Sequence, residues 1–187
     1  MKTHLLIQLI TVAGVVGLVS CAPQMQPTDS QVSASIRPES SLSGQLFQEV
    51  NAYRSRHGAS VLQRHAGLDR LAQEHCKYLH QHRGSFKIRG KNVSHFGFEG
   101  RALEARELYQ MQSVSENVAA TSSGKNLAPG IVNLWAGSKN HEFNMRQSWT
   151  HTGVATVTDS DGMVFATQLF ATVSSSKLAT RERFNRF

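Results

Sequence analysis

Residues 152–173 read TGVATVTDSDGMVFATQLFATV and contain the strongest β-strand pattern in the chain. Two runs rich in Val, Thr and Phe, at 152–158 and 163–173, have the composition of strands. The DSDG sequence between them favours a tight turn. The stretch therefore predicts an antiparallel hairpin, and residues 115–120 predict a further short strand.

Helical periodicity precedes the hairpin along the chain. Apolar residues recur at helical spacing over 42–57 and over 68–79, and Gly58 provides a stop for the first helix. A third helix is predicted at 128–138, with Pro129 near its first position. Helices around a small antiparallel sheet must cover both of its faces, which predicts an α+β fold.

The first 20 residues resemble a secretory signal peptide. Lys2 precedes an apolar run over 5–18, which is too short to span a bilayer comfortably. The run ends in LVSC, which resembles the bacterial lipobox and implies cleavage before Cys21 and lipidation of that cysteine. Because each buried methylene contributes roughly 0.8 kcal/mol, a multiply acylated Cys21 anchors a protein to a membrane. The alternative is an ordinary signal peptide beside an unrelated cysteine.

Composition divides the rest of the chain into a tether, a domain and a tail. Residues 21–41 are rich in Pro, Gln, Ser and Thr, which predicts a flexible tether. Residues 42–173 form the predicted domain, and the basic residues 174–187 form a tail. In a Gram-negative host, Ala22 after the cysteine implies sorting to the outer membrane. The predicted location is therefore the bacterial cell envelope, with the membrane reached through the lipid anchor.

The chain is basic, with 20 Lys and Arg against 13 Asp and Glu and a net charge of +7. Removal of the leader takes away Lys2 and leaves a net charge of +6. This balance favours contact with anionic surfaces such as lipid headgroups and wall polymers. The basic residues are scattered and the chain is predicted to be exported, so nucleic acid is not an expected partner. Cys76 lies in an apolar helical pattern and is predicted to be a buried thiol.

The familiar catalytic motifs are absent from the sequence. There is no G-x-S-x-G, no phosphate-binding loop and no H-E-x-x-H, because His141-Glu142 lacks the second histidine. No serine or cysteine has a convincing base partner, which argues against covalent catalysis. His75 shares the apolar stripe of the second helix and is predicted to be a buried, hydrogen-bonded histidine.

Five motifs follow one another in order between residues 43 and 172. They are NAYRSRHG at 51–58, LDRLAQEH at 68–75, His95 with Arg106 and SENVA at 115–119, WAGSKNHEFN at 135–144, and GVA with FATQLF at 153–170. Together they resemble the CAP superfamily (cysteine-rich secretory, antigen 5 and pathogenesis-related 1 proteins), in its bacterial SCP-like form without disulfides. The resemblance implies a three-layer α-β-α sandwich of the CAP type with a small antiparallel sheet and a cleft.

The resemblance also implies a set of site residues. Many family members line the cleft with two histidines and two acidic residues that can hold a divalent metal. Carried over by position, these are His95, His141 and Glu116, while Ser138 stands where the second acid is usual. Two imidazoles and one carboxylate still suit zinc or another divalent metal, with Glu116 as candidate catalytic base acting through water. Ser138 and Asn117 are expected to line the cleft.

The same residues also have a purely structural interpretation. Glu116 can hold backbone groups or Asn117 at the sheet edge, and His95 and His141 can satisfy each other through water. Trp135 is predicted to be a core residue, and Arg54 is predicted to hold a loop in place.

Three functions are compatible with the sequence. The first is a lipid-tethered binding module whose cleft holds a lipid, a cell-wall fragment or an envelope protein. The second is a metal-assisted hydrolase of peptides or esters, in which Glu116 activates water. The third is a structural or interaction lipoprotein with a vestigial cleft.

Overall fold

The computed structural model describes residues 41–83 and 94–173, which all fall within one compact unit of the chain. Outside these ranges lie the predicted leader, the lipidation site, the tether up to residue 40, most of the 84–95 loop and the C-terminal tail. The elements in chain order are α1 (Leu42–Arg56), β1 (Gln63–Arg64), α2 (Ala66–Gln81), α3 (Phe98–Tyr109), β2 (Met111–Ser122), α4 (Leu127–Ala136), α5 (Lys139–Arg146), β3 (His151–Thr158) and β4 (Met163–Val173).

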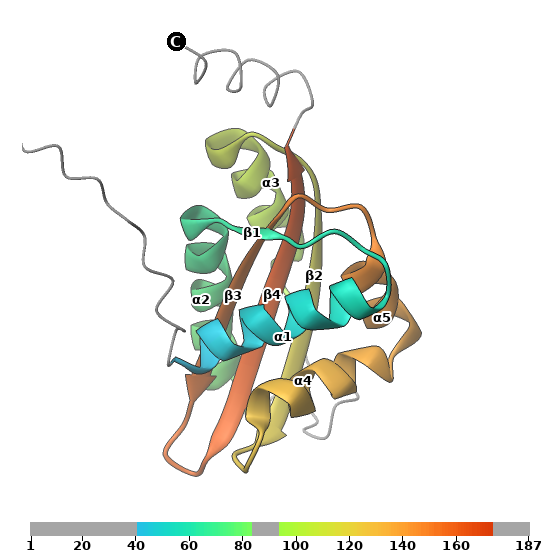
Figure 1. The fold of residues 1–187 in the computed structure, drawn as a ribbon. Coiled ribbons are helices and arrows are strands. Elements are labelled where there is room, and N and C mark those ends of the chain that lie inside the picture. The colour runs from blue at the N-terminus through green and yellow to red at the C-terminus, as the bar shows by residue number, and fades with distance from the viewer. Residues whose placement is uncertain (1–40, 84–93, 174–187) are drawn as a thin grey trace, which may run out of the picture. The chain divides into compact units, whose positions relative to one another are not determined.

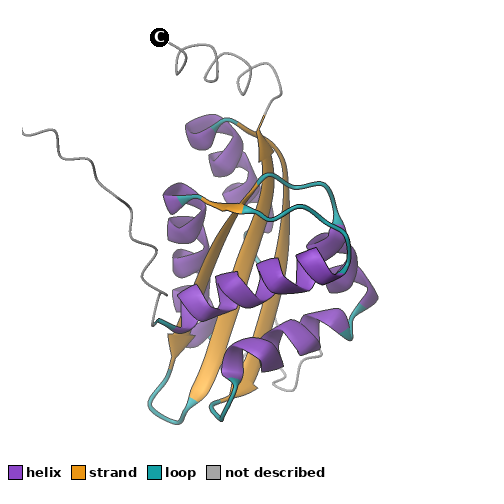
Figure 2. Cartoon of the chain, in the orientation of Figure 1, coloured by secondary structure: helices purple, strands orange, loops and turns teal. Residues whose placement is uncertain are grey.

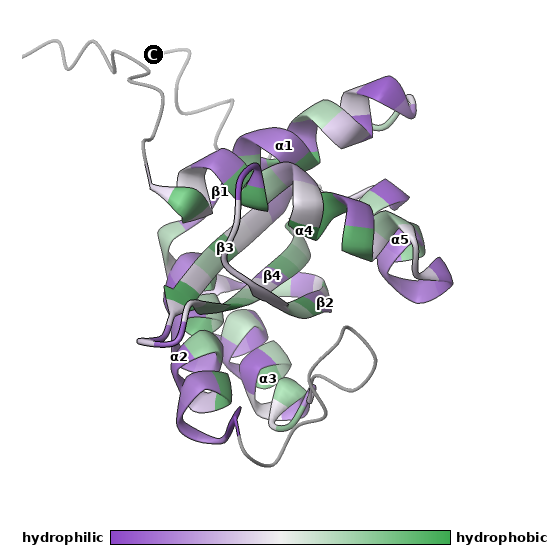
Figure 3. Ribbon diagram, turned by 90° about the horizontal axis from the view of Figure 1, so that it is seen from below, coloured by the Kyte–Doolittle hydropathy of each residue, from purple (hydrophilic) through white to green (hydrophobic). Residues whose placement is uncertain are grey.

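The elements form three layers around one sheet. The strand order is β1-β3-β4-β2, with β4 antiparallel to both of its neighbours. The two-residue strand β1 runs parallel to β3, with Gln63 opposite His151, so the sheet is mixed rather than purely antiparallel. Helices α1, α4 and α5 lie on one side of the sheet, and α2 and α3 lie on the other (Figures 1 and 3). The fold is the predicted α+β, α-β-α sandwich.

The predicted hairpin is confirmed as β3 and β4, which are labelled in Figure 1 and are drawn as orange arrows in the same orientation in Figure 2. Its turn is held by Asp159, whose carboxylate accepts hydrogen bonds from the backbone N–H groups of Asp161 at 2.9 Å and Met163 at 2.8 Å. Arg83, just beyond α2, forms ion pairs with both aspartates. The turn is therefore fixed to the helix layer beneath it.

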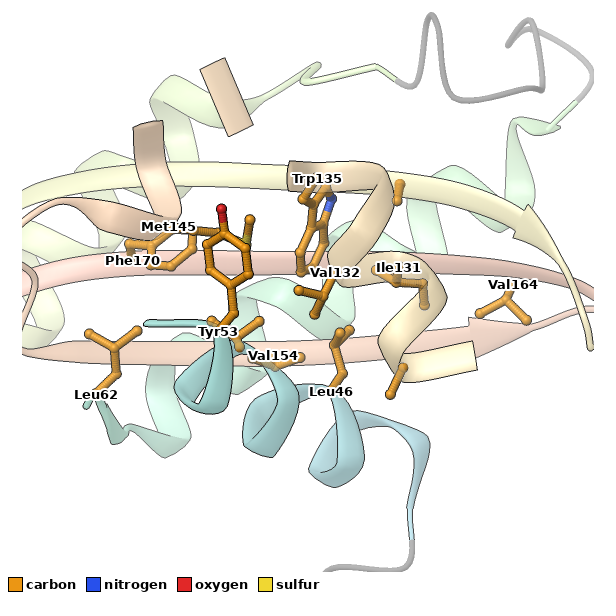
Figure 4. Close-up of a cluster of buried hydrophobic side chains, with 14 residues drawn as sticks. Leu46, Tyr53, Leu62, Ile131, Val132, Trp135, Met145, Val154, Val164 and Phe170 are labelled. Carbon is orange, nitrogen blue, oxygen red and sulfur yellow. The ribbon is translucent and has the colours of Figure 1, made fainter. Parts of the chain in front are cut away.

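Strand β4 is buried on both faces, which explains why its sequence lacks a polar and apolar alternation. Phe170 packs with Trp135 in the cluster beneath α1 and α4 that Figure 4 shows, whereas Leu169 packs in a second cluster on the opposite face. Trp135 has no exposed surface, which confirms the prediction that it is a core residue.

Gly153 on β3 allows α2 to approach the sheet closely. A Cβ at this position would lie 2.0 Å from the carbonyl carbon of Leu68 and 2.3 Å from the nitrogen of Asp69. The Asp69 side chain accepts a hydrogen bond from the N–H of Val154 at 2.8 Å. The first turn of α2 is therefore seated directly on the backbone of β3.

Arg54 near the end of α1 is completely buried. Burial lowers the pKa of its guanidinium. Its N–H groups donate to three backbone carbonyls, those of Ser60, Met145 and Gln147. The predicted loop-holding role is confirmed, because this side chain joins the loop after α1 to the end of α5.

Three elements were not predicted from the sequence, namely β1, α3 and α5. The strand predicted at 115–120 is longer at both ends than expected, as β2. Within 41–83 and 94–173, none of the helices combines the length and hydropathy that crossing a bilayer requires.

Candidate functional site

Glu116 on β2 is the centre of a cluster of polar side chains, called the Glu116 cluster below, which also contains His95 and Arg101. Its carboxylate is only 1% exposed and points to the α2 and α3 side of the sheet. Arg101 of α3 donates to both oxygens, from Nε to Oε2 at 2.8 Å and from Nη2 to Oε1 at 2.9 Å. His95 Nδ1 lies 2.9 Å from Oε1 and must be the donor, since an ionised carboxylate only accepts.

The turn before α3 brings His95 and Arg101 to the same carboxylate. Gly97 has a φ of +75°, a left-handed conformation that glycine adopts without strain. This turn lets the N–H of Phe98 donate to the carbonyl of His95 at 3.0 Å. Arg101 Nη1 also donates to the carbonyl of Phe96 at 2.9 Å, so the guanidinium is fixed at both ends.

Helix α5 is attached to the same strand through two asparagines. Asn117 Nδ2 donates to the carbonyl of His141 at 3.0 Å, and Asn144 Nδ2 donates to Asn117 Oδ1 at 3.0 Å. Asn144 also lies 3.2 Å from the carbonyl oxygen of Glu116. Asn117 has no exposed surface, so it positions α5 rather than facing a ligand as the resemblance implied.

The structure brings the two predicted site histidines together. The ring centroids of His95 and His141 are 6.1 Å apart, although the residues come from opposite sides of the sheet. The side chain of His95 is 48% exposed, whereas that of His141 is partly buried. Burial, aided by the neighbouring His95, lowers the pKa of His141. Ser138 is the residue before α5, and its place in a cleft stays a prediction.

The environment of Glu116 keeps its carboxylate ionised. Burial by itself raises the pKa of Glu116, but the hydrogen bonds from His95 and Arg101 and the charge of Arg101 lower it further than burial raises it. A general base needs a pKa near the working pH and an accessible oxygen. Glu116 has a lowered pKa and three hydrogen bonds to side chains, so it is poorly suited to remove a proton from water.

His75 lies behind this cluster, on α2. It is 1% exposed and its Nε2 donates to the carbonyl of Ser94 at 3.0 Å, which confirms the predicted buried histidine. Its Nδ1 has no hydrogen-bond partner among the described residues. Burial lowers the pKa of His75 to about 4, although Glu116, 3.9 Å away, acts in the opposite direction.

This buried imidazole predicts a pH dependence of stability. Because the pKa of His75 is about 4 in the folded chain and 6.5 ordinarily, the stability it contributes is present above pH 6.5 and is lost as the pH falls towards 4. The loss is expected to reach about 3 kcal/mol. Urea unfolding at a series of pH values should show this slope, and the slope should flatten in His75→Phe. His82→Phe, which changes an exposed ring just beyond the same helix, should keep the wild-type slope.

The side chains present do not fit the metal site that the family resemblance implies. Within the described ranges there is no group of three or more His, Cys, Asp or Glu side chains that could hold an ion. Both oxygens of Glu116 already accept hydrogen bonds from a guanidinium, and a cation beside the carboxylate opposes a second one. His95 and His141 alone supply two imidazoles, fewer than the three protein ligands usual for a catalytic zinc.

A cavity of about 550 Å³ lies elsewhere, between the end of α1 and residues 146–151. Arg54, His57 and Arg146 line it, and no acidic residue does. The C-terminal ends of α1 and α5 meet there, and their partial negative charge offsets the buried guanidinium. None of its lining residues belongs to the Glu116 cluster.

Residues 47–170 match the cysteine-rich secretory protein family, CAP. The chain belongs to this family. No curated protein matches the sequence. Among solved structures, the fold is similar to an outer surface protein from Borrelia burgdorferi, with 18% identity and a TM-score of 0.55 over 69% of this chain and 90% of that one.

Two further solved structures have a similar fold. An extracellular protein with an SCP domain from Bacillus anthracis is 22% identical, with a TM-score of 0.52 over 70% of this chain and 40% of that one. A cysteine-rich secretory protein from Staphylococcus aureus is 15% identical, with a TM-score of 0.52 over 70% and 38%. These likenesses show the fold, and the chain spans less than half of either protein.

The sequence analysis did not identify Arg101 as part of this CAP site. Arg106 was matched to the family pattern, but it is exposed, and Arg101 holds Glu116 instead. The two residues lie more than one helical turn apart on a helix that the sequence did not predict. Cys76 is buried, with its pKa raised to about 12 by burial, which confirms that it is a core thiol rather than a nucleophile.

Proposed function

We propose that this CAP protein is an exported, lipid-anchored binding module of the bacterial cell envelope and not a hydrolase. The observation that carries the proposal is the state of Glu116, whose oxygens are held by Arg101 and His95. A residue in this state is suited to fixing the geometry of a binding surface. It is not free to activate water.

The chemistry of the surface around Glu116 favours a polar, anionic ligand. The exposed ring of His95 lies next to His141, and the guanidinium of Arg101 stands behind it. A neutral His141 has one ring N–H, and the guanidinium of Arg101 has more N–H groups than it uses on Glu116 and Phe96, so both side chains can donate hydrogen bonds to a carboxylate. A carboxylate-bearing fragment of the cell wall therefore suits this surface better than a lipid, and the basic net charge of +7 favours its approach.

The N-terminal sequence and the relatives support the location. Residues 1–20 have the pattern of a lipoprotein leader that is cleaved before Cys21. Two of the similar structures are an outer surface protein and an extracellular protein. An anchor on Cys21 would hold the CAP domain next to the envelope polymers that we propose as ligands.

Binding and hydrolysis can be separated in one experiment. Full-length protein in detergent is mixed with purified peptidoglycan sacculi, and both the protein that sediments and the soluble wall fragments are measured. We expect saturable sedimentation without fragment release. The double variant His95→Ala/His141→Ala should lower the affinity about tenfold or more, since hydrogen bonds to charged groups contribute about 1.5–3 kcal/mol each.

The matched control is His57→Ala/His80→Ala, which removes two exposed imidazoles away from the site and should bind as the wild type does. Equal binding by all three proteins would contradict the assignment of this surface. Release of fragments by the wild type that stops in Glu116→Gln would support the hydrolase instead.

Anchoring is tested with the full chain and Cys21→Ala in a bacterial host. Cells are labelled with a fatty acid that carries a detectable group, and membranes are separated from soluble fractions. The wild type should carry the label and stay with the membranes, whereas Cys21→Ala should be unlabelled and soluble. An unlabelled, soluble wild type would contradict lipidation and favour an ordinary signal peptide.

A further inference from the structure

The Glu116 cluster already contains a cation. Arg101 donates to both carboxylate oxygens, and its remaining terminal nitrogen donates to the carbonyl of Phe96. The Arg101 side chain is 11% exposed. A guanidinium does not lose its proton at any pH at which a protein is folded, so this positive charge is permanent.

We propose that Arg101 is the resident cation of this CAP site and closes it to divalent metals. Its guanidinium neutralises Glu116 and uses the oxygens that a metal ion would need. A metal that entered would have to displace two charge-assisted hydrogen bonds and then sit beside an unpaired, permanent positive charge. Arg101 therefore takes the place of the metal as the cation beside Glu116, and Ser138 stands where the resemblance implies the second carboxylate that would help to hold a metal.

Removal of the guanidinium should open the site to a divalent metal ion. Without Arg101 the Glu116 carboxylate, 1% exposed, would keep one hydrogen bond from the described side chains, the one from His95. A buried carboxylate in that state attracts a cation, and His95 Nδ1 lies 2.9 Å from Oε1, close enough for both to bind one ion. The ring centroid of His141 lies 6.1 Å from that of His95, and this ring must turn towards the carboxylate to supply the third ligand, because the three side chains as they stand do not form a metal-binding group.

The test is a zinc titration by calorimetry and elemental analysis, with the full chain in detergent. Wild type should bind no zinc that depends on His95, and zinc should not change its melting temperature. Arg101→Gln should gain one zinc ion per chain and be stabilised by it, and Arg101→Gln/His95→Ala should lose that gain. Arg106→Gln, which removes an exposed arginine from the same helix, should behave as the wild type does.

Two results would overturn the proposal. One is a wild-type zinc ion that His95→Ala removes, because Arg101 would then move aside for metal. The other is a folded Arg101→Gln that binds no more zinc than the wild type. Arg101→Met, which removes the charge but keeps an unbranched side chain, tests exclusion in the same way if Arg101→Gln is unfolded, and Arg101→Lys, which keeps the charge, should stay free of zinc. These readouts use no wall polymer and are independent of the proposed binding function.

Discussion

Gly153→Ala is expected to destabilise the domain strongly, although it adds only one methyl group. The added carbon would overlap the backbone of Leu68 and Asp69, at 2.0 and 2.3 Å, and backbone cannot rotate away as a side chain can. Overpacking in a core typically costs about 1–3 kcal/mol. Here α2 must also shift away from β3, which breaks the hydrogen bond from Val154 to Asp69. We therefore expect at least about 3 kcal/mol, a large part of a typical domain stability.

Urea unfolding followed by circular dichroism measures this loss. Gly130→Ala in α4 is the matched control, because nothing lies within 4 Å of the added Cβ. It should stabilise the domain by about 0.5–1 kcal/mol through helix propensity. A Gly153→Ala protein as stable as the wild type would show that α2 does not pack on β3 as closely as described.

Arg54→Ala is expected to lower the free energy of unfolding by about 3–5 kcal/mol, because each buried acceptor left without a partner costs about 1–3 kcal/mol and three carbonyls are affected. The change removes every side-chain donor to the carbonyls of Ser60, Met145 and Gln147. The loop after α1 and the end of α5 then lose their common attachment. Water entering the space can satisfy some of these carbonyls, which limits the loss.

Arg56→Ala provides the comparison for Arg54. Arg56 lies in the same last turn of α1 but is exposed, so its removal should change stability by less than about 0.5 kcal/mol. Similar losses in both variants would mean that the general charge of the helix end matters and the three hydrogen bonds do not.

Much of the fold follows from sequence periodicity. Helices α1 and α2 were predicted within two residues of their bounds, because each buries a stripe of large apolar side chains. Helix α3 was missed because it buries only Ala102 and Ala105, while Leu103 and Leu108 are more than half exposed. Helix α5 buries only Met145, so it also lacks an apolar stripe.

The site could be predicted only in part. The family resemblance placed His95, His141 and Glu116 near one another, and the structure shows His95 in contact with both of the others. The spacing of apolar residues could not predict that Arg101 contacts Glu116. That contact depends on the direction in which α3, itself not predicted, leaves the turn at Gly97. Gly97 is the one signal in the sequence, because a glycine at this place favours a turn that ends just before the segment with Arg101.

The outer edges of the sheet are protected against strand addition by two polar side chains. A strand joining the free edge of β2 would need the carbonyl of Glu116, and Asn144 already donates to it. A strand joining β3 beyond β1 would need the N–H of Val154, and this group already donates a hydrogen bond to the Asp69 carboxylate. Each contact removes one position from the ladder that an aggregating chain would use. Copies of the domain that meet at high concentration are thereby hindered from joining into a continuous sheet.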